Sequence, residues 1–248
     1  MRYYGITDQG LIRETNQDNY VTASNENGDV FALVCDGIGG GRGGDVASKM
    51  TIDFFSEVFS KNQGFKSEEE VVAWIQEKVK EANDSVFTKA AGSRQLKGMG
   101  TTMVGVLLTS VGRFIINIGD SRVYSLKKED FKQITHDHTL VEDLLSSGEI
   151  TAEEARVHPK RNVLTNALGV WDKARVDITK YEEEAQAFLV CSDGLYGYLD
   201  HEEIKKVMLS QSLTTGRKVQ KLLKLALDVG GYDNITMILI ELEAGDGR

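Results

Sequence analysis

The stretch "TTMVGVLLTSVGRFIINIG" (residues 101–119) decides the fold class. Its two apolar segments, 101–109 and 113–119, are rich in β-branched residues and are separated by "SVG", so they predict a β-hairpin with a glycine-containing turn. Residues 122–126 and 131–135 flank the charged turn "KKED" and predict a second hairpin. Several strands that follow one another through hairpins are therefore expected.

Helical patterns come in separate blocks on either side of these hairpins. Residues 44–60 carry an apolar stripe at helical spacing, and a second helix opens at Ser67, with Glu70 three residues on as a capping-box signature. The last third adds helical patterns at 201–210 and 215–229. Further strands are expected at 185–192 and 234–242. Because strict β-α-β alternation is absent, the sequence predicts an α+β layered domain.

The composition is that of an ordinary globular protein, with 41% hydrophobic and 27% charged residues. A net charge of −9 with no basic stripe argues against nucleic acid as a partner. No apolar run approaches the roughly 20 residues of a membrane span, and the N-terminus is soon polar, so we expect neither membrane insertion nor a signal peptide, and a cytoplasmic location. Cys35 and Cys191 each end an apolar run outside any C-x-x-C pair, which favours buried free thiols.

One proline, Pro159, and the absence of a linker-like segment predict a single domain over residues 1–242, followed by a polar tail at 243–248. The segment 139–170 differs from its surroundings, because it holds two short amphipathic pieces and a basic cluster, "HPKRN" (158–162). It predicts a helical insertion between strands. The insertion could be a lid over a site or a connector with solvated charges, and the sequence leaves both open.

Aspartates recur where apolar strands end. Asp36 follows "FALVC", Asp120 follows "IINIG", Asp193 follows "FLVCS", and Asp233 stands just before the final strand. A lone aspartate at such a place is commonly a turn former. Four of them on neighbouring strands would converge, and converging carboxylates normally hold a cation. Ligand sets made only of oxygen select Mg²⁺ or Mn²⁺ over zinc.

The loop "CDGIGGGRGGD" (35–45) also contains G-x-G-x-x-G at Gly39, Gly41 and Gly44, a pattern typical of dinucleotide-binding enzymes. That reading needs an acidic residue about 20 positions on, at the end of a second strand. Residues 51–70 are instead helical and then polar, so a dinucleotide-binding oxidoreductase is the weaker alternative. The "HDH" at 136–138 has no second ligand cluster and is expected to be a turn.

A set of motifs in a fixed order resembles the PPM family, the metal-dependent type-2C protein Ser/Thr phosphatases, in its short bacterial form. The resemblance covers about residues 3–242. The motifs, in chain order, are "GLIRETNQDN", "LVCDGIGG", "MGTTMVGVLL", "NIGDSRVY", "THDHTLVEDLLSSGEI", "HPKRNVLTNALG", "LVCSDGLYGYL" and "DNITMILI". The resemblance implies a four-layer α-β-β-α sandwich of two mainly antiparallel β-sheets flanked by helices. It also implies that residues 139–170 form a flap beside the site.

The same resemblance implies a role for each matching residue. Asp36 would bridge two Mg²⁺ or Mn²⁺ ions, the Gly37 carbonyl would complete one of them, and Asp193 and Asp233 would hold the other. Asp120 would hold an additional ion together with Asp193. The implied roles of the two remaining residues are a phosphate grip for Arg13, whose fork suits a phosphate, and a hydrogen bond to metal-bound water for Asp18.

The chemistry implied is hydrolysis of phosphoserine and phosphothreonine by an activated bridging water, with a bacterial Ser/Thr kinase and its targets as partners. One position departs from the family pattern. Many members carry a histidine as proton donor where this chain has Ile38, and Gly41 stands where some bacterial members place another. A metal-bound water or His158 could replace the donor, or the step could go without one. A non-catalytic binding module that keeps the fold is a further alternative, against which the complete set of Asp36, Asp193 and Asp233 argues.

Overall fold

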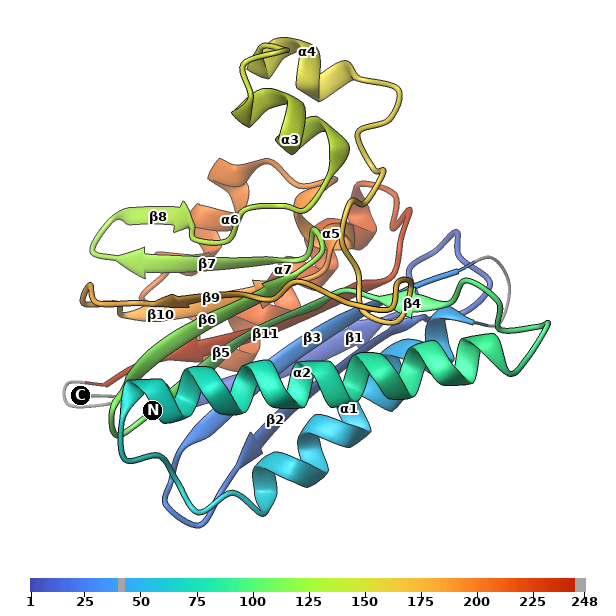
Figure 1. The fold of residues 1–248 in the computed structure, drawn as a ribbon. Coiled ribbons are helices and arrows are strands. Elements are labelled where there is room, and N and C mark those ends of the chain that lie inside the picture. The colour runs from blue at the N-terminus through green and yellow to red at the C-terminus, as the bar shows by residue number, and fades with distance from the viewer. Residues whose placement is uncertain (40–42, 244–248) are drawn as a thin grey trace.

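Two antiparallel β-sheets form the centre of the molecule in the computed structural model, which describes residues 1–39 and 43–243 (Figure 1). Gly41 and tail residues 244–248 lie outside the described part. The strands are β1 (Arg2–Asp8), β2 (Asp18–Ser24), β3 (Val30–Ile38), β4 (Gly100–Thr101), β5 (Met103–Thr109), β6 (Gly112–Ile118), β7 (Arg122–Lys127), β8 (Asp130–Gln133), β9 (Asp177–Lys180), β10 (Ala187–Cys191) and β11 (Ile235–Glu241). The helices are α1 (Gly44–Ser60), α2 (Glu68–Ala91), α3 (Leu140–Ser146), α4 (Ala152–Val157), α5 (Asp193–Tyr196), α6 (His201–Met208) and α7 (Thr215–Asp228).

The first sheet has the strand order β1-β11-β10-β7-β8, and the second has β2-β3-β5-β6-β9 with the short β4 paired to β3. Every pair between described strands is antiparallel. Helices α1 and α2 cover the outer face of the second sheet, and α6 and α7 cover that of the first. The predicted four-layer α+β sandwich is confirmed.

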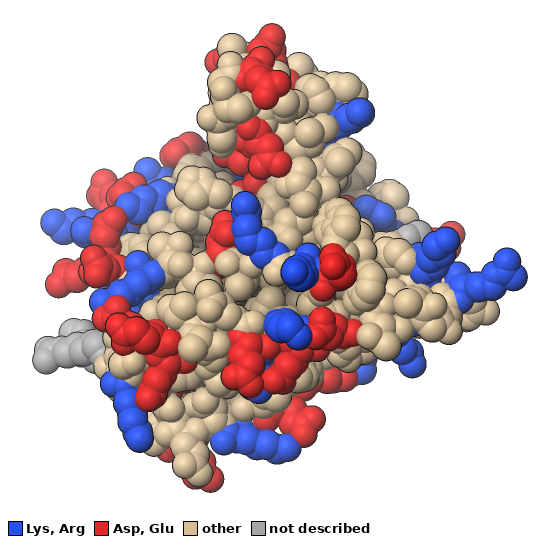
Figure 2. All heavy atoms as spheres, viewed as in Figure 1, with Lys and Arg blue, Asp and Glu red and all other residues tan. Residues whose placement is uncertain are grey.

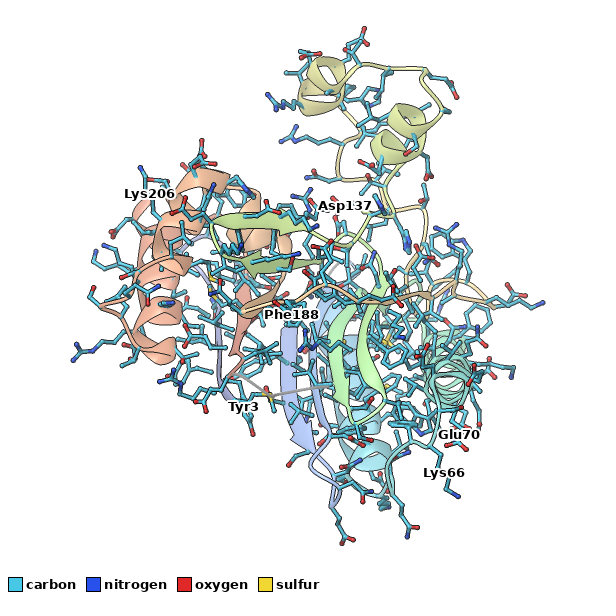
Figure 3. The ribbon with its side chains drawn as sticks, turned by 90° about the vertical axis from the view of Figure 1, so that its left-hand side faces the viewer. Tyr3, Lys66, Glu70, Asp137, Phe188 and Lys206 are labelled. Atoms are coloured by element: carbon cyan, nitrogen blue, oxygen red, sulfur yellow. The ribbon has the colours of Figure 1, made fainter. Side chains whose placement is uncertain are left out.

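Alternation along each central strand explains why the layers stack. In β3, Ala32 and Val34 point into the core between the sheets, whereas Leu33 and Cys35 pack under α1 and α2. β10 repeats the pattern, and its Phe188 lies between the sheets (Figure 3). Both faces of these strands are buried, so their sequences read as continuous apolar runs. The thiols of Cys35 and Cys191 are free and buried.

Several boundaries differ from the expected ones. Residues 101–109 form two strands rather than one, because Thr101 pairs with Gly37 in β4 whereas β5 pairs with Val30–Val34 of β3. The strands β1, β2 and β9 and the helix α5 were not anticipated. β1, β2 and β9 lie at sheet edges, and α5 forms the turn after β10. The helix predicted at 44–60 has those bounds in the structure.

Residues 165–170 of the expected insertion 139–170 pack on the sandwich, where the buried Leu168 bridges to Thr101. The part that carries α3 and α4, residues 139–164, projects from one end of the sandwich (Figure 1). A short antiparallel stem closes its base. Thr139 and Leu164 form a β-bridge, and the Leu140 N–H donates to the Val163 carbonyl at 2.8 Å. Neither α3 nor α4 contains a buried residue, so the two helices make little use of the core.

The surface carries charges of both signs. On the face shown in Figure 2, Lys and Arg side chains are interspersed with Asp and Glu, and acidic side chains gather on the projecting segment. Within the described residues, no helix is both long and apolar enough to cross a membrane.

Candidate metal centre

Four strand ends bring the predicted carboxylates to one pocket of about 370 Å³. Asp36 lies near the end of β3, and Asp120 follows β6 by two residues. Asp193 opens α5 directly after β10, and Asp233 precedes β11. We call this hollow the carboxylate pocket. Its lining residues are Arg13, Gln17, Asp36, Gly37, Ile38, Gly39, Thr102, Asp120, Asn162, Leu164, Asp193, Asp233 and Asn234.

The backbone around Asp36 is held from two sides. Its N–H donates to the Thr102 hydroxyl at 2.9 Å, and its carbonyl accepts from the Thr102 N–H and the Thr101 hydroxyl, both at 2.8 Å. These threonines belong to the break between β4 and β5. Because Thr is an ordinary strand residue, its part in the site gave no distinct signal in the sequence.

The glycine after each of two aspartates is required by close packing. A Cβ on Gly37 would lie 2.2 Å from the Gly44 carbonyl oxygen, and one on Gly194 would lie 1.9 Å from that of Asn234. Any larger residue would push β3 from the start of α1, or α5 from β11. The two Asp-Gly pairs therefore serve one purpose, which is to let the carboxylate strands approach their neighbours.

The carboxyl groups are buried and close together, and this raises their pKa values. Burial, followed by the repulsion of neighbouring carboxylates, raises the pKa of Asp120 to about 7 and that of Asp36 well above its usual range. Burial and the charge of Asp233 raise the pKa of Asp193 to about 6, although a hydrogen bond with Asp36 opposes the shift. The cluster thus carries more negative charge than its surroundings balance.

Asp18 lies behind the pocket rather than in its lining. It is the register partner of Asp36 across β2 and β3, and its Oδ2 accepts a hydrogen bond of 2.7 Å from the Ser192 hydroxyl. Its Oδ1 is buried and has no hydrogen-bond partner among the described residues. Burial is the main cause that raises the pKa of Asp18 to about 7, against hydrogen bonds from Ser192 and Thr236.

Arg13 stands at the mouth of the carboxylate pocket. Its guanidinium is half-exposed and donates to Asp233 at 2.7 Å. That hydrogen bond is the main cause that raises the pKa of Arg13. Asn234 fixes the loop that carries Arg13 to the start of β11, because its amide accepts from the Gln17 N–H and donates to the carbonyls of Gln9 and Thr15.

These residues fit divalent metal ions. The lining offers four carboxylates against one guanidinium, and the orphaned Asp18 Oδ1 adds an unmet acceptor. Within the described ranges, no three Asp, Glu, His or Cys side chains form a compact cluster that could hold an ion by themselves. Backbone oxygen and water would have to complete the coordination, as is usual for Mg²⁺, and Gly37, the residue after Asp36, lines the same pocket.

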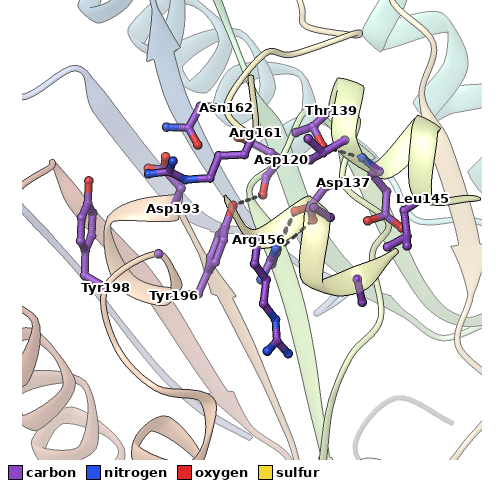
Figure 4. A pocket seen from close by; sticks show the side chains of 16 residues that line it. Asp120, Asp137, Thr139, Leu145, Arg156, Arg161, Asn162, Asp193, Tyr196 and Tyr198 are labelled. Atoms are coloured by element: carbon purple, nitrogen blue, oxygen red, sulfur yellow. Dashed lines mark hydrogen bonds and ion pairs between the residues drawn. The ribbon is translucent and has the colours of Figure 1, made fainter. Parts of the chain in front are cut away.

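A second hollow of about 550 Å³ opens beside the first, between α5 and the projecting part of residues 139–170, for which we use the name flap (Figure 4). It shares Asp120, Asn162 and Asp193 with the carboxylate pocket, and we call it the flap pocket. Asn162 and Leu164 of the flap thus reach the carboxylate pocket. Neither residue was predicted as part of the site, although both belong to the motif "HPKRNVLTNALG" (158–169).

A series of non-covalent contacts between side chains holds Asp120 in place. The Tyr196 hydroxyl donates to the Asp120 carbonyl at 2.7 Å (Figure 4). The Arg122 guanidinium lies 3.6 Å over the Tyr196 ring. Arg122 is held in turn by Asp137 at 2.6 Å. Asp137 is the middle residue of "HDH", so that motif contributes to the site through its aspartate.

The histidines lie elsewhere. His138 is buried, with Nδ1 accepting from the Gly119 N–H and Nε2 lying 2.9 Å from Asp177. His158 does not line either pocket as described, and its Nδ1 accepts from the Lys160 N–H. Ile38, by contrast, lines the carboxylate pocket and has no proton to donate.

A four-layer sandwich with a carboxylate pocket at one end defines a class of phosphatases, and comparison with known proteins agrees. Residues 13–228 match the family described as Protein phosphatase 2C, to which this chain belongs. It is 37% identical to the "Serine/threonine phosphatase stp" of Listeria innocua, over 95% of this chain and 93% of that protein. It is 31% identical to the "Protein phosphatase PhpP" of Streptococcus pneumoniae, over 98% of each chain. The crystal structure of serine/threonine phosphatase Stp1 from Staphylococcus aureus superimposes with a TM-score of 0.90, at 33% identity over 97% of this chain and 94% of that one.

Proposed function

We propose that this chain is a metal-dependent phosphatase that removes phosphate from phosphoserine and phosphothreonine in proteins. One observation carries the proposal: four carboxylates and one arginine line a single pocket, in a chain that belongs to the Protein phosphatase 2C family. The named relatives are serine/threonine phosphatases, which supports the same substrate class.

We assign the metal-holding roles to Asp36, the Gly37 carbonyl, Asp120, Asp193 and Asp233. Asp36 would bridge two Mn²⁺ or Mg²⁺ ions, with Asp193 and Asp233 on one and Gly37 on the other. Asp120 would share a further ion with Asp193. When bound, such ions lower the pKa of water and offset the charge of phosphoryl oxygens. The carboxyls are buried and repel one another, and this supports the assignment. Bound cations would offset both the cost of burying the negative charges and the repulsion between them.

The chain's own residues do the remaining work. Arg13, half-exposed at the mouth, would bind the substrate phosphate while Asp233 holds its guanidinium. Asp18, fixed by Ser192, would accept a hydrogen bond from an ordered water through Oδ1. Position 38 gives the leaving serine or threonine oxygen no proton, and we assign none to His158 either.

The wider assignments follow from the same reading. We propose that residues 1–242 form one catalytic domain in which 139–170 is the flap. The buried free thiols of Cys35 and Cys191 support a reducing, cytoplasmic location. Phosphorylated proteins are the substrates, and a Ser/Thr kinase and its targets are the proposed partners. The net charge of −9 argues against nucleic acid.

The proposal is tested with a phosphothreonine peptide and the purified chain. We expect EDTA to abolish phosphate release and Mn²⁺ or Mg²⁺ to restore it. Asp36→Ala and Asp193→Ala should lower kcat by at least about a hundredfold while the circular dichroism spectrum stays that of the folded protein. Undiminished release in EDTA, or near-normal kcat in either variant, contradicts the metal assignment. No release under any metal condition would favour a non-catalytic binding module.

A further inference from the structure

Exposed apolar side chains gather on the side of the carboxylate pocket where Arg13 stands. Leu11 is 66% exposed, Ile12 63%, Tyr232 51% and Tyr198 43%. We call these four residues the aromatic rim. None of them belongs to a described hydrophobic cluster. Exposed apolar surface of this kind, next to a functional pocket, is typical of a binding surface.

Contacts join the rim into one surface. The rings of Tyr198 and Tyr232 lie 5.3 Å apart between centroids. The Leu11 N–H donates to the Gly231 carbonyl at 2.7 Å, which ties the loop that carries Leu11 and Ile12 to the turn that carries Tyr232. Residues from three parts of the chain are thereby placed side by side.

The rim is continuous with the carboxylate pocket. Ile12 precedes Arg13 and Tyr232 precedes Asp233, and Arg13 and Asp233 are bonded to each other at the pocket mouth. Tyr198 lines the flap pocket together with Asp193. Figure 4 shows Tyr198 beyond Asp193, on the side away from Leu145 of α3. A chain segment leaving the pocket on this side would cross the rim.

We propose that the aromatic rim binds an apolar side chain of the phosphoprotein, within three residues of the phosphorylated one, and so selects among substrates. The inference rests on the proposed phosphatase function and adds a specificity surface to it. An extended peptide advances about 3.3 Å per residue, so neighbours of a phosphoresidue held at Arg13 come within reach of the rim. Tyrosines suit this task, because they offer large contact area with few rotatable bonds.

The test compares peptides within each enzyme variant. Two phosphothreonine peptides differ only in carrying Leu or Ala at the three positions on each side of the phosphoresidue, and p-nitrophenyl phosphate serves as a substrate without flanking residues. We expect the wild-type chain with Mn²⁺ to show about tenfold higher kcat/KM for the Leu peptide. In Tyr198→Ala and in Ile12→Ala, the ratio of the two kcat/KM values should fall towards one.

Tyr3→Ala is the matched control, because Tyr3 is 45% exposed and lies at the end of β1 remote from Asp8 and the pocket. It should keep the wild-type ratio. The ratio is internal to each variant, so a general loss of activity does not mimic the effect. Equal kcat/KM for both peptides in wild type, or a ratio unchanged in both rim variants, would contradict the proposed role of the rim. If p-nitrophenyl phosphate is still hydrolysed in that case, the proposed phosphatase function is not contradicted. If neither the peptides nor p-nitrophenyl phosphate are hydrolysed, both proposals are wrong.

Discussion

Gly37 and Gly194 show how single residues set the spacing of the site. Each follows an aspartate of the carboxylate pocket, and each lies against the backbone of another element. The sequence indicated the Asp-Gly pairs and their place after apolar strands. It did not indicate what the glycines touch, since Gly44 and Asn234 approach them only in the folded chain.

We expect Gly37→Ala to lower the free energy of unfolding by about 1–3 kcal/mol, because the new methyl group would overlap backbone oxygen. Activity with Mn²⁺ should fall at least tenfold, because the displaced strand end carries Asp36. Urea denaturation and phosphopeptide kinetics measure the two effects.

Gly92→Ala is the control for that substitution. A Cβ at Gly92 would meet its nearest atom at 3.5 Å, an ordinary contact. The change should leave the free energy of unfolding within about 0.5 kcal/mol of wild type and activity intact. Equal damage from both substitutions would show that packing at Gly37 is not special.

Residues that act through others were harder to find. The four metal-ligand candidates stand out because the pattern of an aspartate beside an apolar strand recurs, whereas a single one is commonly a turn former. They are Asp36, Asp120, Asp193 and Asp233. Tyr196 hydrogen-bonds to Asp120 across 76 residues and is covered by Arg122, and a single sequence carries no sign of such a pairing. In the sequence, Asp137 stood out only as the residue between His136 and His138, a motif that was expected to be a turn.

At the scale of elements, helices α2 and α4 begin with the same type of N-cap but bury different numbers of residues. Ser67 caps α2 and Thr151 caps α4, each by accepting the backbone N–H three residues on. The full capping box is present only at Thr151, because Glu70 bonds to the Lys66 N–H rather than to that of Ser67. Helix α2 buries seven residues, whereas α4 buries none, so the same lost hydrogen bond should act globally in one and locally in the other.

We expect Ser67→Ala to cost about 1 kcal/mol of global stability and to lower Tm by roughly 2–4 °C. Thr151→Ala should leave Tm unchanged and speed hydrogen exchange of the amides in 152–157 about fivefold. Calorimetry and exchange followed by mass spectrometry measure these effects. A Tm loss in Thr151→Ala as large as that in Ser67→Ala would contradict the separation of the flap from the core.

Element prediction succeeded for long buried patterns. It failed for very short elements and for the edge strands β1 and β2, whose residues are mostly exposed or partly buried. The seventeen residues of α1 were predicted at both ends, because the apolar stripe spans several turns. β9 and α5 have only four residues each, too few for a pattern to be recognised. The break at Thr102 was missed because pairing with β3, a tertiary event, divides an otherwise uniform strand.

For the whole molecule, the carboxylate pocket places four acidic side chains close together in a chain of net charge −9, and their repulsion destabilises the fold. Metal binding should stabilise the fold by mass action. At Mn²⁺ a hundred times above Kd, we expect about 2.7 kcal/mol and a rise in Tm of roughly 5–10 °C.

Asp193→Asn supplies the comparison. It removes one buried carboxylate whose pKa burial raises, so in EDTA the variant should melt at or above the wild-type temperature. In Mn²⁺ it should gain much less than wild type. Scanning fluorimetry in both buffers measures the four Tm values, and an equal Mn²⁺ shift in the two proteins would mean that the ions stabilise the chain at some other place.

The stem at the base of the flap has a consequence for how this family can diversify. The bridge between Thr139 and Leu164 brings the two ends of the projecting segment together, whatever lies between them. The entropy of closing a loop grows only slowly with its length. The stretch between Thr139 and Asn162 can therefore act as an exchangeable cassette, lengthened, shortened or grafted from a relative, while the sandwich below and Asn162 in the carboxylate pocket are kept.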